Sequence, residues 1–373
     1  MSYASTMANA RLPPDTDPLS HAQSLIEQGR AGEAAAILTP LIESDRAGLP
    51  ARLLQARALQ AHGQAALAME SARETALLHP DVAEAALSFA ERLLSAGLLP
   101  SAIAEFQRSL RLEPDLHAAR YGLGCAWLAA GEPEKALREF GSLSADNIAP
   151  DLPARMAEAE RMRAAPRSDA RYVRHLFDQF SSDYDARMVG ELGYAAPRIL
   201  RELATLVMPT LRNGTLDILD LGCGTGLAGA AFRQVAKRLD GIDLSPSMVD
   251  RARRRGVYDR LSVGDVEAIP NGGERYDLIV AADTLVYLGD LSPVFAAAHR
   301  VLKPAGFFLS TVEKDEGEGF ALGPKRRWRH SEDYLKAAAK AAGFEIAGVV
   351  ACSPRTEGSI AVDGLAVALQ KPL

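Results

Sequence analysis

The pattern of apolar and polar positions changes in character along this chain of 373 residues. From Thr215 onward, short apolar runs such as LDILDL and YDLIVAAD alternate with longer amphipathic segments such as GLAGAAFRQVAKR and SPSMVDRARRRG. Strand-length runs that alternate with helix-length segments predict a parallel, doubly wound sheet, which binds its ligand at the carboxyl ends of the strands. The last two runs, FEIAGVVACS and GLAVALQK, have no helix between them and are expected to pair antiparallel at the sheet edge.

The first 150 residues follow a longer period that predicts paired helices. A glycine recurs every 34 residues, and an alanine lies five residues after each of these glycines. Such a repeat, with a glycine in the turn and a small residue at a close helix contact, is typical of a helix-turn-helix solenoid. Pro80 and Pro114 are expected to end the second helix of the two middle repeats. The two series are Gly29, Gly63, Gly97 and Gly131, and Ala34, Ala68, Ala102 and Ala136.

This pattern resembles the tetratricopeptide repeat family, as four repeats over about residues 15–150. The outer repeats depart from it, since Arg46 stands where the closing proline of the first would fall, and the fourth has Ile148 with Pro150 two residues late. Arrays of this family usually bind peptides or partner proteins. The resemblance therefore implies partner binding, scaffolding or self-association, and the sequence leaves the choice among these roles open.

Three further segments complete the expected domain plan. Residues 1–14 are expected to be disordered, and residues 151–170 to form a capping helix and a linker, because AAPRSDA has the character of a hinge. Residues 171–190 repeat apolar side chains three or four positions apart, which predicts a helix with one apolar face. A hinged helix rich in aromatic residues suits a lid that excludes water, and Phe180 and Tyr184 are its candidate cofactor contacts.

Composition narrows the class of protein further. The chain is 48% hydrophobic and 24% charged with a net charge of −6, which disfavours a general nucleic-acid or anionic-membrane binder. Its three cysteines, Cys125, Cys223 and Cys352, are widely spaced, so neither a disulfide framework nor a metal site is indicated. No stretch approaches the roughly 18 apolar residues of a bilayer span, and the first residues lack the pattern of a signal peptide. We therefore expect a cytoplasmic protein that binds neither nucleic acid nor membranes.

The stretch DILDLGCGTGLAG places four glycines within eight residues and raises two alternatives. GTGLAG has the glycine spacing of a dinucleotide site, in which the amino end of a helix holds an anionic pyrophosphate. Asp220, two residues before the first glycine, would oppose a pyrophosphate there but would attract a ligand that carries an ammonium and a sulfonium. The sequence therefore favours S-adenosylmethionine over a nicotinamide dinucleotide.

Two more acidic residues stand at expected strand ends. Asp243, in LDGIDLS, is placed to accept hydrogen bonds from two ribose hydroxyls, although nicotinamide enzymes place an acid at a similar distance. Asp265, in VGDVEAIP, suits an adenine amino group, with the Val266 amide donating to a ring nitrogen and Ile269 covering the base. Each acid taken alone could be a turn or N-cap residue, but together they fit one ligand.

Residues 171–373 resemble a class I S-adenosylmethionine-dependent methyltransferase, with LDLGCGTG, Asp243, GDVEAIP and YDLIVAADTLVYL as its first four motifs. The resemblance implies a Rossmann-like sheet of seven strands that ends in an antiparallel hairpin, with S-adenosylmethionine as methyl donor and S-adenosylhomocysteine as product. In LKPAGFFL, Ala305 stands where the family has a second glycine. A further resemblance, to bacterial methyltransferases with N-terminal tetratricopeptide repeats, carries no substrate with it. The cofactor-site residues implied here, or added from neighbouring motif positions, are Asp220, Gly222, Cys223, Gly224, Asp243, Leu244, Met248, Asp265, Val266 and Ala282.

The sequence is less specific about the acceptor. Methyl transfer needs proximity and, for an oxygen or nitrogen acceptor, a base, and His330 and Tyr287 are the candidates for a catalytic role. His330 lies just before a predicted helix that starts at Ser331, so it could equally flank the N-cap. The basic run KRRWR, residues 325–329, could hold a substrate carboxylate or phosphate, touch RNA, or form a solvated loop.

Three functions fit these observations: a small-molecule methyltransferase, a protein methyltransferase whose substrate docks on the repeats, and a partner-binding protein with an inactive cofactor domain. An NAD-dependent enzyme is a more remote fourth. The intact motifs count against an inactive domain, whereas the expected lid favours a small acceptor. We therefore expect O- or N-methylation of a small molecule.

Overall fold

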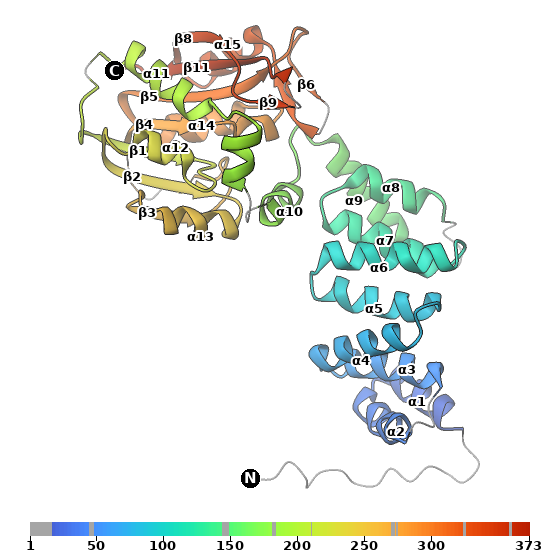
Figure 1. Cartoon of the computed structure of the whole chain (residues 1–373). Coiled ribbons are helices and arrows are strands. Elements are labelled where there is room, and N and C mark those ends of the chain that lie inside the picture. The colour runs from blue at the N-terminus through green and yellow to red at the C-terminus, as the bar shows by residue number, and fades with distance from the viewer. Residues whose placement is uncertain are drawn as a thin grey trace. The chain divides into compact units, whose positions relative to one another are not determined.

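The chain divides into two compact units (Figure 1), Met1–Arg163 and Ala164–Leu373, called here the helical unit and the sheet unit. The expected disordered residues 1–14 lie outside the described part of the chain, as do Arg46 and Ile148. Within the described part, no helix is long and apolar enough to span a membrane. The computed structural model describes residues 17–44, 48–143, 149–180, 184–209, 211–269, 273, 275–323, 326–357 and 360–373.

The helical unit consists of helix pairs joined by tight glycine turns. Gly29, Gly63, Gly97 and Gly131 follow the first helix of each pair with φ between 72° and 81°, a left-handed conformation that strains other residues. The four alanines five positions later are completely buried, as their predicted close helix contacts require. The helices are α1 (Pro18–Glu27), α2 (Ala31–Glu43), α3 (Leu49–Ala61), α4 (Ala65–Leu78), α5 (Ala83–Ser95), α6 (Leu99–Leu112), α7 (His117–Ala129), α8 (Pro133–Gly141) and α9 (Leu152–Ala164).

Prolines and aromatic side chains shape the middle of this unit. α4 and α6 each end two residues before Pro80 and Pro114, which were predicted to stop them. Phe106 and Phe140 are completely buried on the second helices of their pairs. The apolar faces of these hairpins are therefore covered by neighbouring hairpins, as a solenoid requires.

The sheet unit contains a mixed sheet whose central strands are parallel. The strand order is β3-β2-β1-β4-β5-β11-β8, and β11 runs antiparallel to both β5 and β8. This confirms the predicted parallel core and the antiparallel pair at its edge, while β7 pairs with β5 and β6 pairs with β7. The strands are β1 (Leu216–Leu221), β2 (Ala236–Asp243), β3 (Arg260–Val263), β4 (Tyr276–Ala281), β5 (Leu302–Lys314), β6 (Phe320–Leu322), β7 (Trp328–His330), β8 (Glu345–Cys352), β9 (Thr356–Glu357), β10 (Ile360–Ala361) and β11 (Gly364–Gln370).

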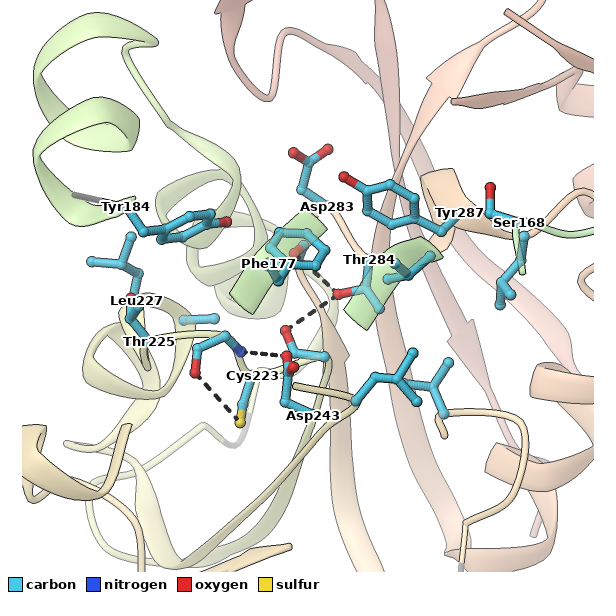
Figure 2. A pocket seen from close by; sticks show the side chains of 18 of the residues that line it. Ser168, Phe177, Tyr184, Cys223, Thr225, Leu227, Asp243, Asp283, Thr284 and Tyr287 are labelled. Carbon is cyan, nitrogen blue, oxygen red and sulfur yellow. Dashed lines mark hydrogen bonds between the residues drawn. The ribbon is translucent and has the colours of Figure 1, made fainter. Parts of the chain in front are cut away.

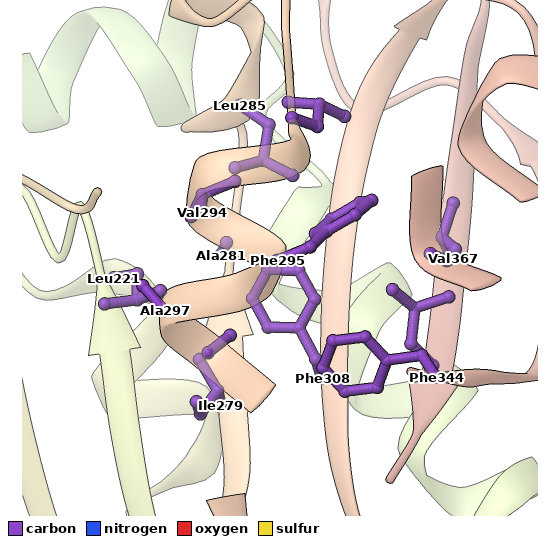
Figure 3. Close-up of a cluster of buried hydrophobic side chains, with 14 of the residues drawn as sticks. Leu221, Ile279, Ala281, Leu285, Val294, Phe295, Ala297, Phe308, Phe344 and Val367 are labelled. Carbon is purple, nitrogen blue, oxygen red and sulfur yellow. The ribbon is translucent and has the colours of Figure 1, made fainter. Parts of the chain in front are cut away.

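Helices cover both faces of this sheet. On one face α14 and α15 bury an apolar cluster in which Phe295, Phe308 and Phe344 meet with ring centroids 5.7 to 6.5 Å apart (Figure 3). On the other face α11 and α12 pack against Ile218 and Val280. The helices of this unit after the lid segment are α11 (Ala196–Val207), α12 (Leu227–Phe232), α13 (Pro246–Arg255), α14 (Ser292–Val301) and α15 (Glu332–Ala341).

In the described residues, the lid helix predicted over residues 171–190 is represented by two helical pieces. α10 (Ala170–Phe180) ends before the polar stretch SSD, and a short π-helix, Ala186–Glu191, follows. SSD interrupts the apolar face in the sequence, and Gly190 is unfavourable inside an α-helix. The lid segment is therefore built from two helical pieces.

Candidate functional site

A pocket opens at the carboxyl ends of the central strands (Figure 2). Including its open mouth, the pocket takes up about 810 Å³. Its walls come from the loops after β1 to β4, the start of α12 and the segment before β1. The lining residues are Arg167, Ser168, Val173, Phe177, Tyr184, Tyr194, Gly222, Cys223, Gly224, Thr225, Leu227, Ala228, Asp243, Leu244, Asp265, Val266, Ala282, Asp283, Thr284, Tyr287 and Leu288.

The loop after β1 explains its unusual glycine content. A Cβ atom added at Gly222 would lie 2.4 Å from the Thr284 side chain, and one added at Gly229 would lie 2.3 Å from the Tyr258 hydroxyl. At Gly224, which borders the pocket, an added Cβ atom would meet nothing within 4 Å. Several of these glycines are therefore required by packing within the protein. The dinucleotide-like spacing is not by itself evidence for a pyrophosphate site.

Asp243 is fixed at the end of β2 by two backbone amides. Its Oδ2 accepts a hydrogen bond from the Gly224 amide at 2.9 Å, and its Oδ1 accepts one from the Ser245 amide at 2.8 Å. Figure 2 shows the carboxylate at the pocket, where burial raises the pKa of Asp243. Each oxygen keeps a further lone pair, so two adjacent ligand hydroxyls can bind it together.

Asp265 follows β3 and borders the pocket together with Val266. Its Oδ1 accepts a hydrogen bond from the Glu267 amide at 3.0 Å, and its Oδ2 pairs with Nη2 of Arg167 at 2.8 Å. Arg167 belongs to the segment that the sequence assigns to a linker. Ile269, expected to cover the base, is instead buried in the core and is not among the described lining residues.

The structure corrects the prediction for Asp220. Its side chain is 1% exposed, is not among the described lining residues, and accepts a hydrogen bond from the Tyr258 hydroxyl at 2.7 Å. Burial raises the pKa of Asp220 to about 7, so the carboxyl is partly protonated at neutral pH. The charge argument that favoured a sulfonium ligand over a pyrophosphate therefore does not hold, and the cofactor must be argued from other residues.

Aromatic side chains from three segments meet at the pocket (Figure 2). The Phe177 ring of α10 lies edge-on to the rings of Tyr184 and Tyr287, with centroid distances of 6.0 Å and 5.5 Å. Tyr194, just before α11, donates a hydrogen bond to the Ala282 carbonyl at 3.2 Å. Burial raises the pKa of all three tyrosines, so their hydroxyls stay protonated at neutral pH.

Two carboxylates tie the lid segment to the loops at the pocket. Asp178 accepts a hydrogen bond from the Ser245 hydroxyl at 2.5 Å, and Asp185 accepts one from the Thr225 hydroxyl at 2.5 Å. Asp185 also pairs with Arg255, whose Nε donates to the Thr225 carbonyl at 2.7 Å. Ser245 and Thr225 belong to the loops after β2 and β1, so the lid segment is fastened to both.

Asp283, after β4, is held in an ionic cluster at the pocket wall. Its φ of 56° is uncommon for a residue other than glycine, and its carboxylate pairs with Arg355, whose side chain is completely buried. Arg355 also pairs with Glu313, and Arg327 joins the cluster by pairing with Glu357. Asp283 is therefore an ion-pair partner and does not have the freedom of a general base.

The structure contradicts the catalytic assignment of His330. Its side chain is completely buried, is not among the described lining residues, and its Nε2 lies 2.9 Å and 3.0 Å from the carbonyl oxygens of Leu288 and Gly289. Burial lowers the pKa of His330 to about 4, so a neutral ring donates to these carbonyls. His330 thus supports the loop that carries Tyr287, and only Tyr287 of the two candidates borders the pocket.

The remaining candidates divide into two groups. Met248 is completely buried in the first turn of α13 and is not among the described lining residues, so it is not retained as a cofactor contact. The side chain of Phe180 lies outside the described part of the chain. No cluster of three or more His, Cys, Asp or Glu side chains in the described residues could hold a metal ion. The candidates that border the pocket are Gly222, Cys223, Gly224, Asp243, Leu244, Asp265, Val266, Ala282, Tyr184 and Tyr287.

The basic run at residues 325–329 is engaged within the chain where it is described. The Arg326 guanidinium lies 4.9 Å from the centre of the Tyr172 ring, and Arg329 pairs with Asp315 at 3.5 Å. Both guanidinium groups, which were candidates to bind a substrate anion or RNA, are therefore engaged by other residues of the chain.

Sequence patterns do not identify several pocket residues. Thr225 lies within the glycine motif, so its hydroxyl group could have suggested a place at the pocket. Phe177 lies on the predicted apolar face of the lid, where nothing separates it from core residues. Arg167, Ser168 and Tyr194 carry no signal in the sequence, because only tertiary contacts bring them to the pocket.

Comparison with known proteins identifies the central part of the sheet unit. Residues 218–306 match a family described as a methyltransferase domain. This range contains the loops after β1, β2, β3 and β4, which form much of the pocket wall.

Similar proteins include several methyltransferases. The malonyl-[acyl-carrier protein] O-methyltransferase of Serratia marcescens is 34% identical over 93 residues, which cover 25% of this chain and 36% of that protein. The human methyltransferase-like protein 27 is 35% identical over 30% of this chain and 46% of its own length. The ubiquinone biosynthesis O-methyltransferase of Bartonella tribocorum is 27% identical over 35% of this chain and 56% of its own length. The chain thus spans about a third to just over half of these three relatives.

Solved structures with a similar fold include the 1,6-didemethyltoxoflavin-N1-methyltransferase of Burkholderia thailandensis. It is 23% identical, with a TM-score of 0.44, over 56% of this chain and 92% of its own. The [4+2]-cyclase SpnF is 21% identical, with a TM-score of 0.47, over 56% of this chain and 99% of its own.

Proposed function

We propose that this protein, whose C-terminal part contains a class I S-adenosylmethionine-dependent methyltransferase domain, transfers a methyl group from that cofactor to an oxygen or nitrogen atom of a small molecule. The observation that carries the proposal is the Asp243 carboxylate, which two backbone amides hold at the pocket. The match of residues 218–306 to a methyltransferase family supports the same assignment.

The residues at the pocket fit this cofactor. Asp243 offers one free lone pair on each oxygen to the two ribose hydroxyls, and Asp265 offers a carboxylate to the adenine amino group. Gly224 leaves room beside the pocket where a side chain would intrude. When bound, the cofactor supplies an activated methyl group on a positively charged sulfur.

The aromatic residues have the properties needed near such a charge. Phe177 contacts both Tyr184 and Tyr287 at the pocket, and aromatic rings attract cations and exclude water. Because their raised pKa values keep the tyrosine hydroxyls protonated, Tyr287 donates a hydrogen bond to an acceptor more readily than it removes a proton. We therefore assign Tyr287 to positioning the acceptor.

A small acceptor is favoured by the enclosure of the pocket. The lid segment forms one wall through Val173 and Phe177 and is hydrogen-bonded to the loops after β1 and β2. The names of two similar proteins, which are O-methyltransferases of malonyl-[acyl-carrier protein] and of ubiquinone biosynthesis, support an oxygen acceptor.

We also infer that the helical unit is a tetratricopeptide array that binds a partner protein or a second copy of the chain. The 34-residue spacing of its glycine turns and its buried alanines support this inference. If the bound partner is itself methylated, the protein is a protein methyltransferase, which is the second candidate function.

Calorimetry tests the cofactor. The full chain is expected to bind S-adenosylhomocysteine and to show no binding of NADH, whereas tight NADH binding without a response to S-adenosylhomocysteine would overturn the proposed function. Asp277→Asn is a suitable control, because Asp277 pairs with Lys303 and is not among the described lining residues. It should leave the affinity for S-adenosylhomocysteine unchanged.

A labelling experiment tests the acceptor class. The full chain is incubated with cofactor carrying a radioactive methyl group and with the small-molecule or the protein fraction of a bacterial extract. Label is expected in the small-molecule fraction. Label that appears only on protein would contradict the small acceptor and support the second candidate.

A further inference from the structure

The first residues of the sheet unit form part of the pocket wall. Residues 166–168, called the strap here, run antiparallel to the loop after β4. The carbonyl of Pro166 accepts hydrogen bonds from the amides of Gly289 and Asp290, both at 2.9 Å, and the Ser168 amide donates to the Tyr287 carbonyl at 2.8 Å. Ser168 lies beside Tyr287 at the pocket in Figure 2. The predicted hinge is therefore a fixed element of the site.

A glycine at position 289 allows the strap to lie close to the loop after β4. A Cβ atom added there would lie 2.8 Å from the Pro166 carbonyl oxygen and 2.7 Å from the Trp328 ring. The φ of Gly289 is not in the left-handed region, so close approach of the strap, and not backbone conformation, requires a glycine.

The strap places the guanidinium group of Arg167 at the pocket wall. Arg167 borders the pocket, and its Nη2 lies 2.8 Å from Oδ2 of Asp265, while its Nη1 pairs with Glu267. The second oxygen of Asp265 accepts the Glu267 amide at 3.0 Å. Both oxygens of Asp265 are thus held from the protein side, and each keeps a lone pair for a ligand.

The exposed fractions of Arg167 and Asp265 indicate whether their ion pair mainly stabilises the fold or mainly orients the carboxylate. The side chains of Arg167 and Asp265 are 27% and 25% exposed, so water screens their attraction and the pair adds little to folding stability. Arg167 holds one oxygen of Asp265 and the Glu267 amide holds the other, so the two contacts together nevertheless fix the direction of the carboxylate. Fixing a hydrogen-bond acceptor before the ligand arrives lowers the cost of binding.

From these contacts we propose that Arg167 is a positioning residue of the cofactor site, which aims the Asp265 carboxylate at the amino group of adenine. The inference rests on the proposed function, because it takes adenine to be the base bound at Asp265. It assigns the first residues of the sheet unit a role in cofactor recognition.

The test compares two ligands on the full chain. S-adenosylhomocysteine carries an amino group on its base, whereas S-inosylhomocysteine carries in its place a carbonyl oxygen, which accepts hydrogen bonds and cannot donate one to Asp265. The wild-type chain should prefer the amino ligand. Arg167→Gln should weaken S-adenosylhomocysteine roughly tenfold, as the loss of one well-oriented hydrogen bond to a charged group does, and should barely change the affinity for S-inosylhomocysteine.

Two further variants separate positioning from structure. In an Asp265→Ala background, Arg167→Gln should have no additional effect, since Arg167 acts through Asp265. Arg233→Gln is the matched control, because Arg233 forms an ion pair of the same 2.8 Å length with Asp259 and is not among the described lining residues. It should leave both affinities unchanged.

The outcomes distinguish the two levels of the argument. Equal weakening of both ligands by Arg167→Gln would mean that the strap only supports the fold, and an unchanged preference would mean that Arg167 does not aim Asp265. Either result overturns the inference while the proposed function stands. A wild-type chain that binds neither ligand overturns the proposed function itself.

Discussion

The turn glycines of the helical unit and the glycines of the loop after β1 serve different purposes. In the helical unit, the four turn glycines have φ between 72° and 81°, and an added Cβ atom would meet nothing within 4 Å at Gly29, Gly63 or Gly97. In the sheet unit, an added Cβ atom at Gly222 or Gly229 would collide with a side chain that is distant in the sequence. The turn glycines are required by local backbone geometry, whereas Gly222 and Gly229 are required by long-range packing.

This difference explains what each group of glycines reveals in the sequence. A local requirement that is repeated every 34 residues produces a period, and a period can be recognised without a structure. A long-range requirement occurs once and depends on which loop lies opposite. The comparison predicts that alanine substitutions in the two groups of glycines lower the free energy of unfolding by different amounts. It also predicts that a second substitution can restore stability only where the first one causes a clash.

The largest effect is expected at Gly222. Gly222→Ala adds a methyl group 2.4 Å from the Thr284 side chain at a φ of 69°, so strain and overpacking together should cost roughly 3–5 kcal/mol of unfolding free energy in the sheet unit. Trp328 reports on this unit and Trp127 on the helical unit. Urea unfolding followed by Trp328 fluorescence in a Trp127→Phe background measures the loss.

Two variants test the cause of that loss. Thr284→Ala combined with Gly222→Ala should restore part of the stability, because it removes the two closest atoms of the clash. Gly348→Ala, where the nearest atom would be 3.5 Å away, should cost far less. If Thr284→Ala restores no stability, backbone strain alone accounts for Gly222 and the contrast between the two groups of glycines disappears.

The same contrast accounts for what the sequence could predict of the site. Asp243 and Asp265 follow strands that apolar runs mark, so their place at the pocket edge could be expected from topology. Asp220 ends a strand as well, but its neighbour Tyr258 is 38 residues away, and this contact turns it from the ligand to the interior. His330 likewise reaches the carbonyl of Leu288 through the fold. Such pairings leave no pattern in the sequence.

The second largest effect is expected on ligand affinity. Asp243→Ala should reduce the affinity for S-adenosylhomocysteine by about 1–3 kcal/mol, since two ligand hydroxyls would lose a charged acceptor. Unlike Gly222→Ala, it should leave the Trp127 and Trp328 unfolding transitions almost in place. Calorimetry measures the affinity, and an unchanged value in a folded variant would remove Asp243 from the cofactor site.

A pH experiment separates the buried charge of the sheet unit from the surface charges of the helical unit. The pKa of Asp220 is about 7 in the folded state and 3.8 ordinarily, so between these values the folded state binds more protons and its stability falls as the pH rises. Asp220→Asn stays neutral and avoids this loss. Relative to wild type, it should gain about 2 kcal/mol between pH 5 and pH 8.

Trp328 fluorescence should report this gain, and Trp127 fluorescence should not. In the helical unit Glu33 and Glu70 pair at the surface with Arg30 and Arg73, which lowers the pKa of both carboxyls. A gain at pH 8 that equals the gain at pH 5 would show that Asp220 titrates normally.

The smallest effect is expected at the turn glycines. Gly97→Ala forces a left-handed φ of 72° on an alanine without any clash, which should cost about 1 kcal/mol in the helical unit. Gly141→Ala is the matched control, because Gly141 has open space around it, ends α8 and lacks a positive φ, so the substitution should be neutral or stabilising. Trp127 fluorescence in a Trp328→Phe background measures both. Equal costs at the two positions would show that backbone conformation is not what the repeated glycines provide, and a change in S-adenosylhomocysteine affinity would show that the helical unit influences the pocket.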